Sequence, residues 1–217
     1  MKHLILFHRH PHEMNGDFSF ELPSWLGKEE IDKNLKYHRF IDRYNHLAGK
    51  LLLKLSMQQI GLQSELMHDI LVTEQKRPYL PVPYDFNITH CDDAIAIAIA
   101  ENRNIGLDIE DLCPLTIQDF HHCFTTCEWN DIITSKNQYE RFLYYWTRKE
   151  AVLKAIGSGL LIHPSTFEAI RNMVLMDDKT LYIYPITIDK RHICHLATED
   201  SNPEISIHEV KNLFDSL

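Results

Sequence analysis

Two acidic residues on one short segment have the types and spacing to hold a divalent cation. The segment at 105–110 reads IGLDIE, so apolar residues alternate with Gly106, Asp108 and Glu110. A β-strand would place both carboxylates on one face, about 7 Å apart. Paired acids repel each other unless a cation lies between them, and Mg²⁺ suits such a pair because it combines a few carboxylates with substrate phosphates. A solvated strand would show the same alternation, so the pair alone decides nothing.

A further acid and a lysine lie on the strongest helical pattern in the chain, at 139–156. Glu150 and Lys154 are four residues apart and so share one helix face. The simplest interpretation is an ion pair at the surface. However, the helix is rich in apolar residues and is expected to be buried, and buried ionised groups need an opposite charge or a metal. The apolar residues around the pair are Tyr144, Tyr145, Trp146, Val152, Leu153 and Ile156.

Composition limits the classes of protein to which the chain can belong. Its 44% hydrophobic and 24% charged residues are typical of globular proteins. The net charge of −9 argues against broad nucleic-acid binding, so an anionic substrate would need a local or metallic counter-charge.

The apolar run at 4–7 is too short for a signal peptide, and no run approaches the roughly 18 residues of a membrane helix. Five cysteines without a CxxC pair favour reduced thiols, so we expect a cytoplasmic protein that binds neither nucleic acid nor membrane.

Two histidine-bearing segments are weaker candidates for metal binding. One contains His8, His10 and His12, and the other contains His121, His122, Cys123 and Cys127. In the first, Pro11 interrupts the alternation, which favours a solvated loop. In the second, no further ligand pair lies at the spacing of a zinc finger, and the segment is predicted to be an ordinary helix.

The elements that must position these groups come in blocks. Strands are predicted at 4–7, 86–90, 94–100, 105–110, 180–188, 192–197 and 205–210. Helices are predicted at 28–59 with a break within 42–49, and at 64–72, 117–122, 126–134 and 139–156. Residues 77–83 are rich in proline and are predicted to form an extended connector. Blocks of this kind favour an α+β fold, and we divide the chain into halves at 1–102 and 103–217.

Three signatures in order carry a resemblance to a known family. They are IGLDIE at 105–110, FTTCEW at 124–129 and YWTRKEAVLKAIGSGL at 145–160. They resemble the motifs of the 4′-phosphopantetheinyl transferase superfamily, roughly G-x-D, F-x-x-x-E and W-x-x-K-E-A-x-x-K. Upstream, RPYLP and FNITH are similar to coenzyme A-binding segments of the Sfp-type branch. The resemblance implies two similar α/β halves related by a pseudo-twofold axis in a monomeric chain.

The activity that this resemblance implies is a group transfer. The 4′-phosphopantetheine of coenzyme A would pass to a serine of an apo acyl or peptidyl carrier protein, with Mg²⁺ as cofactor and adenosine 3′,5′-bisphosphate as the product released. Two other functions are kept as alternatives: a metal-dependent hydrolase of coenzyme A or nucleotide pyrophosphates, and a non-catalytic module that binds a carrier protein or coenzyme A. The carrier and its pathway are not specified by the sequence.

The resemblance also implies roles for individual residues. Asp108, Glu110 and Glu150 would ligate Mg²⁺, Glu150 would serve as the base for the attacking serine, and Lys154 would hold the phosphates and the leaving group. Further contacts to coenzyme A would come from Lys33, Arg43, Arg77, Pro78, Thr89 and His90.

Departures from the family pattern affect the coenzyme A site. Lys76 stands where the family usually has glycine, Arg77 replaces a common lysine, and Thr89 replaces the usual serine. Arg77 keeps the positive charge and Thr89 keeps the hydroxyl, whereas Lys76 in place of glycine affects the loop that would shape the adenine pocket. Glu128 of the middle signature is open to either a structural or an active-site role.

Overall fold

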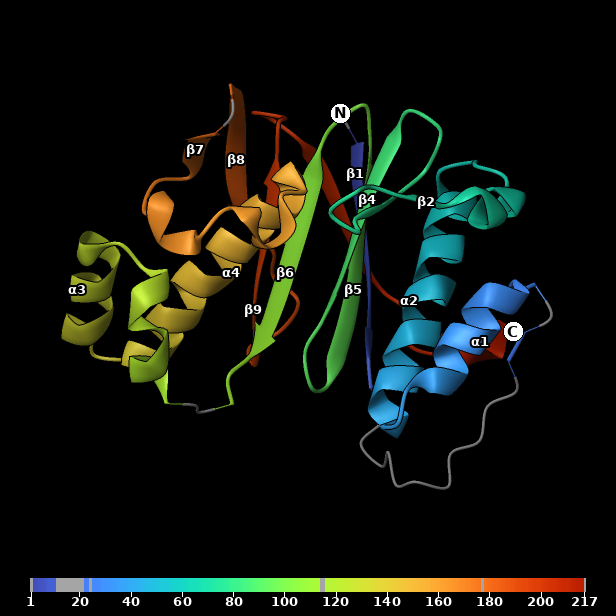
Figure 1. The fold of residues 1–217 in the computed structure, drawn as a ribbon, viewed down its shortest axis with the longest axis horizontal. Helices are drawn as coiled ribbons and strands as arrows, with labels where there is room; N and C mark the ends of the chain where they lie inside the picture. The colour runs from blue at the N-terminus through green and yellow to red at the C-terminus, as the bar shows by residue number, and fades with distance from the viewer. Residues whose placement is uncertain (1, 11–21, 24, 114–115, 177, 217) are drawn as a thin grey trace.

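The computed structural model describes residues 2–10, 22–23, 25–113, 116–176 and 178–216. Two four-stranded sheets lie next to each other between α-helices (Figure 1). The first sheet has the order β10-β1-β5-β4 and consists of β1 (Lys2–Arg9), β4 (Tyr84–His90), β5 (Ala94–Glu101) and β10 (Glu204–Glu209). The second has the order β6-β9-β8-β7 and consists of β6 (Ile105–Asp111), β7 (Met173–Met176), β8 (Lys179–Pro185) and β9 (His192–Thr198).

The helices and a short ribbon complete the fold. The α-helices are α1 (Lys28–Lys36), α2 (Phe40–Gln59), α3 (Thr126–Thr134) and α4 (Gln138–Ile156). The ribbon pairs β2 (Leu71–Val72) with β3 (Pro78–Tyr79). The 3₁₀ helices are η1 (Ser64–Asp69), η2 (Ile117–Cys123), η3 (Gly159–Leu161), η4 (Pro164–Thr166) and η5 (Leu213–Ser216). Within the described residues, no helix combines the length and apolar character needed to cross a bilayer.

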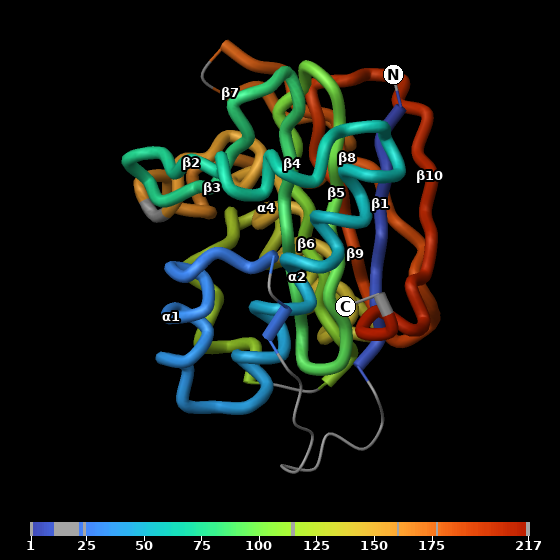
Figure 2. The backbone as a smooth tube through the Cα atoms, turned by 90° about the vertical axis from the view of Figure 1, so that its right-hand side faces the viewer, coloured from blue at the N-terminus to red at the C-terminus, as the bar shows by residue number. Residues whose placement is uncertain are grey.

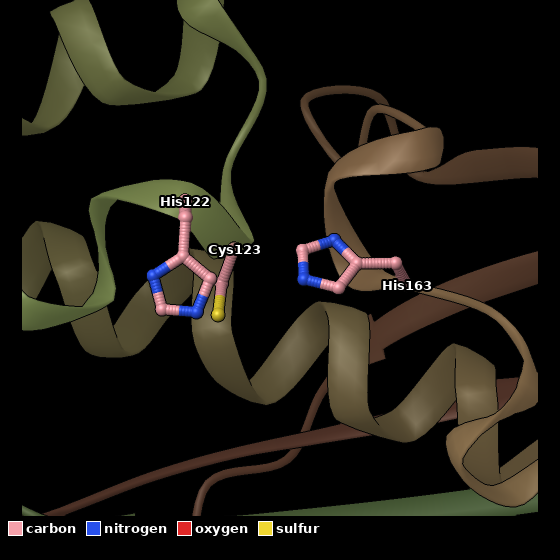
Figure 3. A group of neighbouring side chains, drawn as sticks. All are labelled: His122, Cys123 and His163. Atoms are coloured by element: carbon pink, nitrogen blue, oxygen red, sulfur yellow. The ribbon is translucent and has the colours of Figure 1, made fainter.

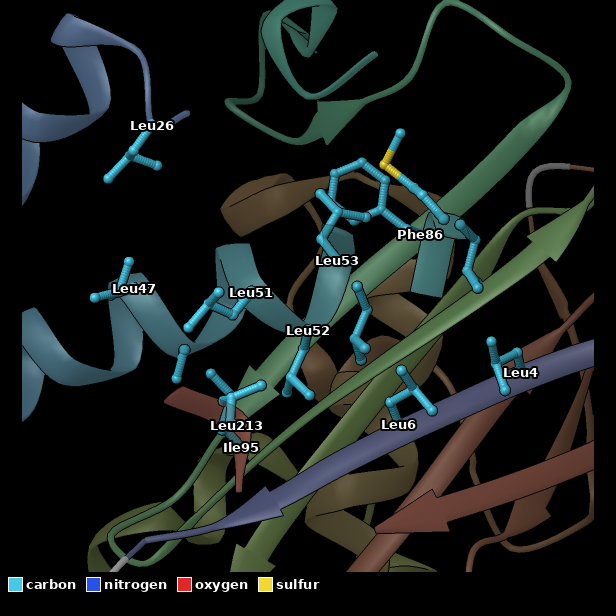
Figure 4. Close-up of a cluster of buried hydrophobic side chains, with 14 of the residues drawn as sticks. Leu4, Leu6, Leu26, Leu47, Leu51, Leu52, Leu53, Phe86, Ile95 and Leu213 are labelled. Carbon is cyan, nitrogen blue, oxygen red and sulfur yellow. The ribbon is translucent and has the colours of Figure 1, made fainter. Parts of the chain in front are cut away.

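Strand β5 explains why the sheets stack. Its sequence alternates isoleucine and alanine, so each residue type occupies one face. The isoleucines share a core with leucines of α2, including Leu47 and Leu51 (Figure 4). The alanines share a second core with Ile105, Leu107 and Ile109 of β6. Because alanine is small, the two sheets can pack closely, and the layers run α2, first sheet, second sheet, α4.

The other face of β6 is covered by α4 at unusually short range. A Cβ atom added to Gly106 would lie 2.0 Å from the carbonyl oxygen of Ala151 and 2.4 Å from the backbone nitrogen of Ala155. Only glycine allows the helix and strand backbones to approach this closely. Since Asp108 and Glu110 share the face of Gly106, the close approach brings both carboxylates to α4.

Side chains of β4 fix its position against β6. The backbone nitrogen of Ile105 donates to Asp85 Oδ2 at 2.8 Å, and that of Leu107 donates to Asn87 Oδ1 at 2.9 Å. These bonds replace a regular backbone ladder between the two sheets. They set the register that places Thr89 of β4 beside Asp108.

The predicted α+β class is confirmed. The order β1-β5-β4 recurs as β6-β9-β8, as two similar halves would require, whereas the pseudo-twofold axis stays a prediction. The C-terminal strand β10 pairs in parallel with β1 (Figure 2), so residues 204–209 complete the first sheet although they follow the second in sequence. The division at 102 and 103 separates the two sheets except for this strand.

Two helix predictions were wrong in detail. The chain breaks between α1 and α2 at 37–39, not within 42–49. Gly49 lies inside α2 because that point of the helix packs against Ile88 and Ile95, where contact outweighs the low helix propensity of glycine. Residues 64–72 form η1 and then β2, since Leu71 and Val72 pair with β3. Strand β7 was not predicted.

Candidate active site

Asp108 lies at the centre of the site, on β6 between β4 and α4. It is only 4% exposed. Its Oδ1 accepts hydrogen bonds from Lys154 Nζ at 2.6 Å and from Thr89 Oγ1 at 3.3 Å. Burial raises the pKa of Asp108, and the charge of Lys154 opposes that rise. Its Oδ2 is buried and has no hydrogen-bond partner among the described residues, so this oxygen is suited to coordinate a cation.

Two further carboxylates interact with Asp108. Glu110 accepts a hydrogen bond from Trp146 Nε1 at 3.2 Å, and burial together with the charge of Asp108 raises its pKa to about 7. Burial and then Asp108 also raise the pKa of Glu150. Lys154 counters these charges but supplies only one positive charge against three carboxylates. The excess of negative charge favours binding of a cation.

The three carboxylates have the donor set of a magnesium site but are not drawn tightly together. In the described residues, two groups bring three possible ligand atoms within 4.8 Å of one another, and this set is not one of them. Instead, the ammonium of Lys154 occupies the space beside Asp108 and also donates to Thr89 Oγ1 and to the carbonyl oxygen of Leu107, each at 3.2 Å. The chemistry of the oxygens and the unpartnered Asp108 Oδ2 fit Mg²⁺.

Two cavities reach these residues. One, of about 390 Å³, is lined by Glu150 and Lys154 together with parts of 75–78 and 159–164. The other, of about 460 Å³, is lined by Glu110, His90 and residues at the start of α2. The site is therefore accessible from two directions to a ligand that carries phosphate groups.

Arg77 connects the two sheets. Its guanidinium donates to Asp85 Oδ2 at 2.6 Å and to the carbonyl oxygens of Ile105 at 2.9 Å and Ala155 at 3.0 Å. Its charge is therefore already paired. Lys76 is exposed, lines the cavity with Glu150, and has no ion pair within the described residues. Its φ of +63° lies in the left-handed region that favours glycine, which accounts for the glycine that the family pattern has there.

The remaining predicted contacts are spread over the site. Pro78 lines the cavity with Glu150, and His90 lines the cavity with Glu110. Thr89 is buried and bonded to Asp108. Lys33 and Arg43 line neither cavity. In the α1–α2 region, the basic residue that lines one of these two cavities is Arg39, at the start of α2, which belongs to the same basic stretch of sequence.

Glu128 is a structural residue. It is fully buried and pairs with Lys149, with Nζ and Oε2 2.8 Å apart. Its carboxylate also accepts hydrogen bonds from the backbone nitrogens of Thr125 at 2.9 Å and Ala169 at 2.7 Å. Lys149 donates in addition to backbone carbonyl oxygens of the loop that follows α4. Two motif residues thus attach this loop and the start of α3 to α4.

The prediction for the first histidine segment needs correction, and one aromatic residue has a further role. His8 and His10 are buried at the end of β1 and not in a solvated loop; His8 Nε2 lies 2.7 Å from the hydroxyl of Tyr44. His12 lies outside the described residues. Trp146 was expected mainly to pack in the core, and it also donates a hydrogen bond to Glu110. The signal for this role was its place in the W-x-x-K-E motif.

The fold and site thus define an enzyme-like, carboxylate-rich centre between two cavities, and comparison with known proteins shows the family. The model of the 4′-phosphopantetheinyl transferase superfamily matches residues 104–201. The chain is 30% identical over 173 residues to 4′-phosphopantetheinyl transferase gsp of Aneurinibacillus migulanus, covering 77% of this chain and 71% of that protein. It is 32% identical over 187 residues to L-aminoadipate-semialdehyde dehydrogenase-phosphopantetheinyl transferase of Schizosaccharomyces pombe, covering 74% and 72%.

Two further matches have lower identity. 4′-Phosphopantetheinyl transferase Sfp of Bacillus subtilis is 26% identical and covers 83% of this chain and 79% of that protein. A crystal structure of holo-[acyl-carrier-protein] synthase from Thermotoga maritima overlaps 44% of this chain and 61% of that chain, with a TM-score of 0.35 and 16% identity. From the sequence relatives, the chain belongs to the 4′-phosphopantetheinyl transferase superfamily.

Proposed function

We propose that this protein transfers 4′-phosphopantetheine from coenzyme A to a serine hydroxyl of an apo acyl or peptidyl carrier protein, with Mg²⁺ as cofactor. The observation that carries the proposal is the buried Asp108, whose Oδ2 is unpartnered, while burial and then the charge of Asp108 raise the pKa of both Glu110 and Glu150. Family membership supplies the reaction class, and the charge balance of the site supports a divalent cation.

The chemistry consists of one bond made and one broken. The serine oxygen attacks the phosphorus that carries pantetheine, and the pyrophosphate bond to adenosine 3′,5′-bisphosphate breaks. Magnesium held by Asp108, Glu110 and Glu150 would neutralise the pyrophosphate and polarise it for attack. No part of the carrier is needed for these contacts except its serine.

Glu150 is the proposed base. It borders the cavity that coenzyme A would enter, and its pKa is raised by burial and by Asp108. A carboxylate with a pKa nearer to neutrality is a better acceptor for the serine proton. Lys154 lines the same cavity and would redirect a donor to an oxygen of the departing phosphate, which would relieve the negative charge that develops there.

Coenzyme A is proposed to lie along the wall formed by residues 75–78. Pro78 would contact the adenine, and Thr89 and His90 would contact phosphates, with Thr89 also orienting Asp108. Since Arg77 is paired with Asp85, Lys76 is the better-placed cation for the adenosine phosphates. Lys33 and Arg43 stay proposed contacts that would require the α1–α2 region to approach the ligand.

The decisive experiment measures both transfer and release. The protein is incubated with coenzyme A and Mg²⁺, with and without apo carrier proteins, and intact mass is followed alongside adenosine 3′,5′-bisphosphate. We expect the carrier to gain one phosphopantetheine and the bisphosphate to appear only when the carrier is present. Release that ignores the carrier would favour the alternative, a pyrophosphate hydrolase, and binding without either product would favour a non-catalytic module.

The role of Glu150 is tested by Glu150→Gln. Loss of the base and of one metal ligand is expected to lower transfer by roughly 10²- to 10⁴-fold without unfolding the protein. Glu101→Gln is a matched control because that carboxylate is exposed at the end of β5. Near-normal turnover in Glu150→Gln would exclude the proposed role.

The cysteines, the cavities and the net charge support proposals for the compartment, the oligomeric state and the partners of the protein. The five cysteines are all free thiols, as a reducing compartment such as the cytoplasm allows. We propose that the chain acts as a monomer, because both cavities are formed by one chain. Its net charge of −9 supports a function without nucleic acid.

A further inference from the structure

His122, Cys123 and His163 form a cluster of possible metal ligands outside the carboxylate site. One ligand atom of each lies within 4.8 Å of those of the other two. His122 and Cys123 end η2, whereas His163 immediately precedes η4. Figure 3 shows the imidazole of His163 pointing toward the other two side chains. Two segments distant in sequence therefore converge on one point.

The buried pair of Glu128 and Lys149 holds these segments in place. Glu128 forms a capping box with Thr125, directly after η2. Lys149 Nζ lies 2.8 Å from Glu128 and donates to the carbonyl oxygen of Pro164 at 2.8 Å. Pro164 follows His163 in the chain. The backbone on both sides of the cluster is thus attached to one buried ion pair, and the cluster is preorganised.

His163 has a neighbour that can select its metal-binding tautomer. Its Nδ1 lies 2.8 Å from Ser165 Oγ. With the proton on Nδ1, the ring donates to that hydroxyl and leaves the lone pair of Nε2 free for a metal. This tautomer gives up the 3.4 Å contact from the backbone nitrogen of Ser165 and keeps the 2.8 Å contact to the hydroxyl, which then accepts instead of donating. A hydrogen-bonded second nitrogen is usual for metal-bound histidine.

We propose that His122, Cys123 and His163 bind a transition-metal ion of the zinc class, with a fourth position open to water. One thiolate and two imidazoles are a preferred ligand set for Zn²⁺, whereas Mg²⁺ prefers oxygen. The thiol of Cys123 releases its proton to solvent when the metal–sulfur bond forms. Tetrahedral bond lengths place ligand atoms roughly 3.3–3.6 Å apart. Since the three ligand atoms already lie within 4.8 Å of one another, binding requires each pair to approach by at most roughly 1.5 Å.

The position of the site gives it a consequence for the neighbouring cavity. His163 and Pro164 also line the cavity that contains Glu150 and Lys154. Zinc bound to His163 would add a second link between the loop at 159–164 and η2, besides the Glu128–Lys149 pair, and would so stiffen one wall of that cavity. The metal would therefore regulate access to the cavity, whereas binding itself depends only on the three ligands and not on the proposed transfer reaction.

The test measures metal binding without any substrate. Reduced, chelator-treated full-length protein is titrated with Zn²⁺ against a chromophoric chelator, and with Co²⁺ to detect a thiolate-to-cobalt charge-transfer band. We expect about one zinc ion per chain and a clear cobalt band. Cys123→Ser should abolish the band, and each of Cys123→Ser, His122→Gln and His163→Gln should weaken zinc binding at least tenfold, about the least that loss of a supporting group costs.

Cys127→Ser is the matched control, because this exposed cysteine lies close in sequence but outside the cluster. Its zinc affinity should equal that of the unaltered protein. Circular dichroism checks the fold of each variant, and the two exposed histidine variants decide the outcome if Cys123→Ser does not fold. Unchanged zinc affinity in both histidine variants, or an equal loss in Cys127→Ser, would overturn the proposal.

Discussion

Lys154 has three hydrogen-bond donors, and the protein itself accepts from all of them through Asp108, Thr89 and Leu107. The lysine is thus held in one position beside the cavity that the proposed reaction fills with a phosphate, and its charge balances part of the carboxylate cluster. A flexible surface lysine would lose rotamer entropy on binding, whereas this one is already ordered. Two other residues of the site are fixed by a neighbour in the same way: Glu110 by Trp146, and Arg77 by Asp85.

Lys76 illustrates how a single position can carry two physical effects. Lys76→Ala is expected to raise KM for coenzyme A roughly tenfold, equivalent to about 1.4 kcal/mol, with kcat little changed, because an unpaired cation at the cavity wall is lost. Lys76→Gly should raise KM equally but stabilise the fold by about 1 kcal/mol, because glycine adopts the positive φ without strain. Steady-state kinetics and urea unfolding measure both effects.

Lys76→Arg serves as the control for charge and should keep KM close to that of the unaltered protein. If Lys76→Ala and Lys76→Gly both retain the original KM, the cation that meets the adenosine phosphates must be sought elsewhere, first at Arg77.

At the scale of elements, the contact between α4 and β6 determines the site geometry. Gly106→Ala is expected to destabilise the protein by about 3 kcal/mol, since the new Cβ would overlap backbone atoms of α4 that have no freedom to rotate away. Transfer should fall as well, because the helix that carries Glu150 and Lys154 must move. Gly49→Ala is the comparison: its Cβ would meet only side-chain atoms at 3.4 Å or more, and its stability should change little. Equal losses in the two variants would contradict this account.

The contact between α1 and α2 predicts a dependence of stability on pH. Glu30 lies 2.8 Å from both His46 Nε2 and Lys50 Nζ, and these partners lower its pKa from 4.5 to about 2. A lowered acid pKa stabilises the folded state above pH 4.5, and the benefit is lost as the pH falls toward 2. Glu30→Gln should cost about 1–2 kcal/mol at neutral pH, allowing for solvent screening of a partly exposed carboxylate.

Urea unfolding across this pH range tests the prediction. The curves of the unaltered protein and of Glu30→Gln should converge toward pH 2, while Glu29→Gln, an exposed neighbour, should follow the unaltered protein. A constant gap at all pH values would show that the loss does not arise from the charge of Glu30.

The sequence predicted these elements unevenly, for physical reasons. The alternation in 94–100 and the apolar pattern of 139–156 predicted β5 and α4 well, because both are buried through most of their length. The break was predicted within 42–49 instead of at 37–39, because the sequence does not show that packing against Ile88 and Ile95 keeps Gly49 helical. The pairing of Arg77 with Asp85 and the approach of His163 to Cys123 join segments that only the tertiary structure brings together, so no local pattern announces them.

At the scale of the whole molecule, the two sheets do not form independent units. The core between them contains residues of β1, β5, β6 and β9, and β10 returns from the second half to complete the first sheet. Arg77 adds polar contacts across the same boundary. Because neither sheet can keep its inner face buried without the other, we expect the protein to unfold in one cooperative transition.

Leu196→Ala, in the core between the sheets, tests this cooperativity. Leu196 is fully buried, so truncation should cost about 2–5 kcal/mol through lost burial and a cavity. The decrease in the free energy of unfolding should be the same whether unfolding is followed at Trp25, which packs on the α2 side, or at Trp129, which packs on the α4 side. Variants that keep one of these two tryptophans, with phenylalanine at the other two tryptophan positions, allow urea unfolding to be followed separately on each side by fluorescence. Two distinct midpoints, or a shift confined to Trp129, would show that the sheets unfold as separate domains.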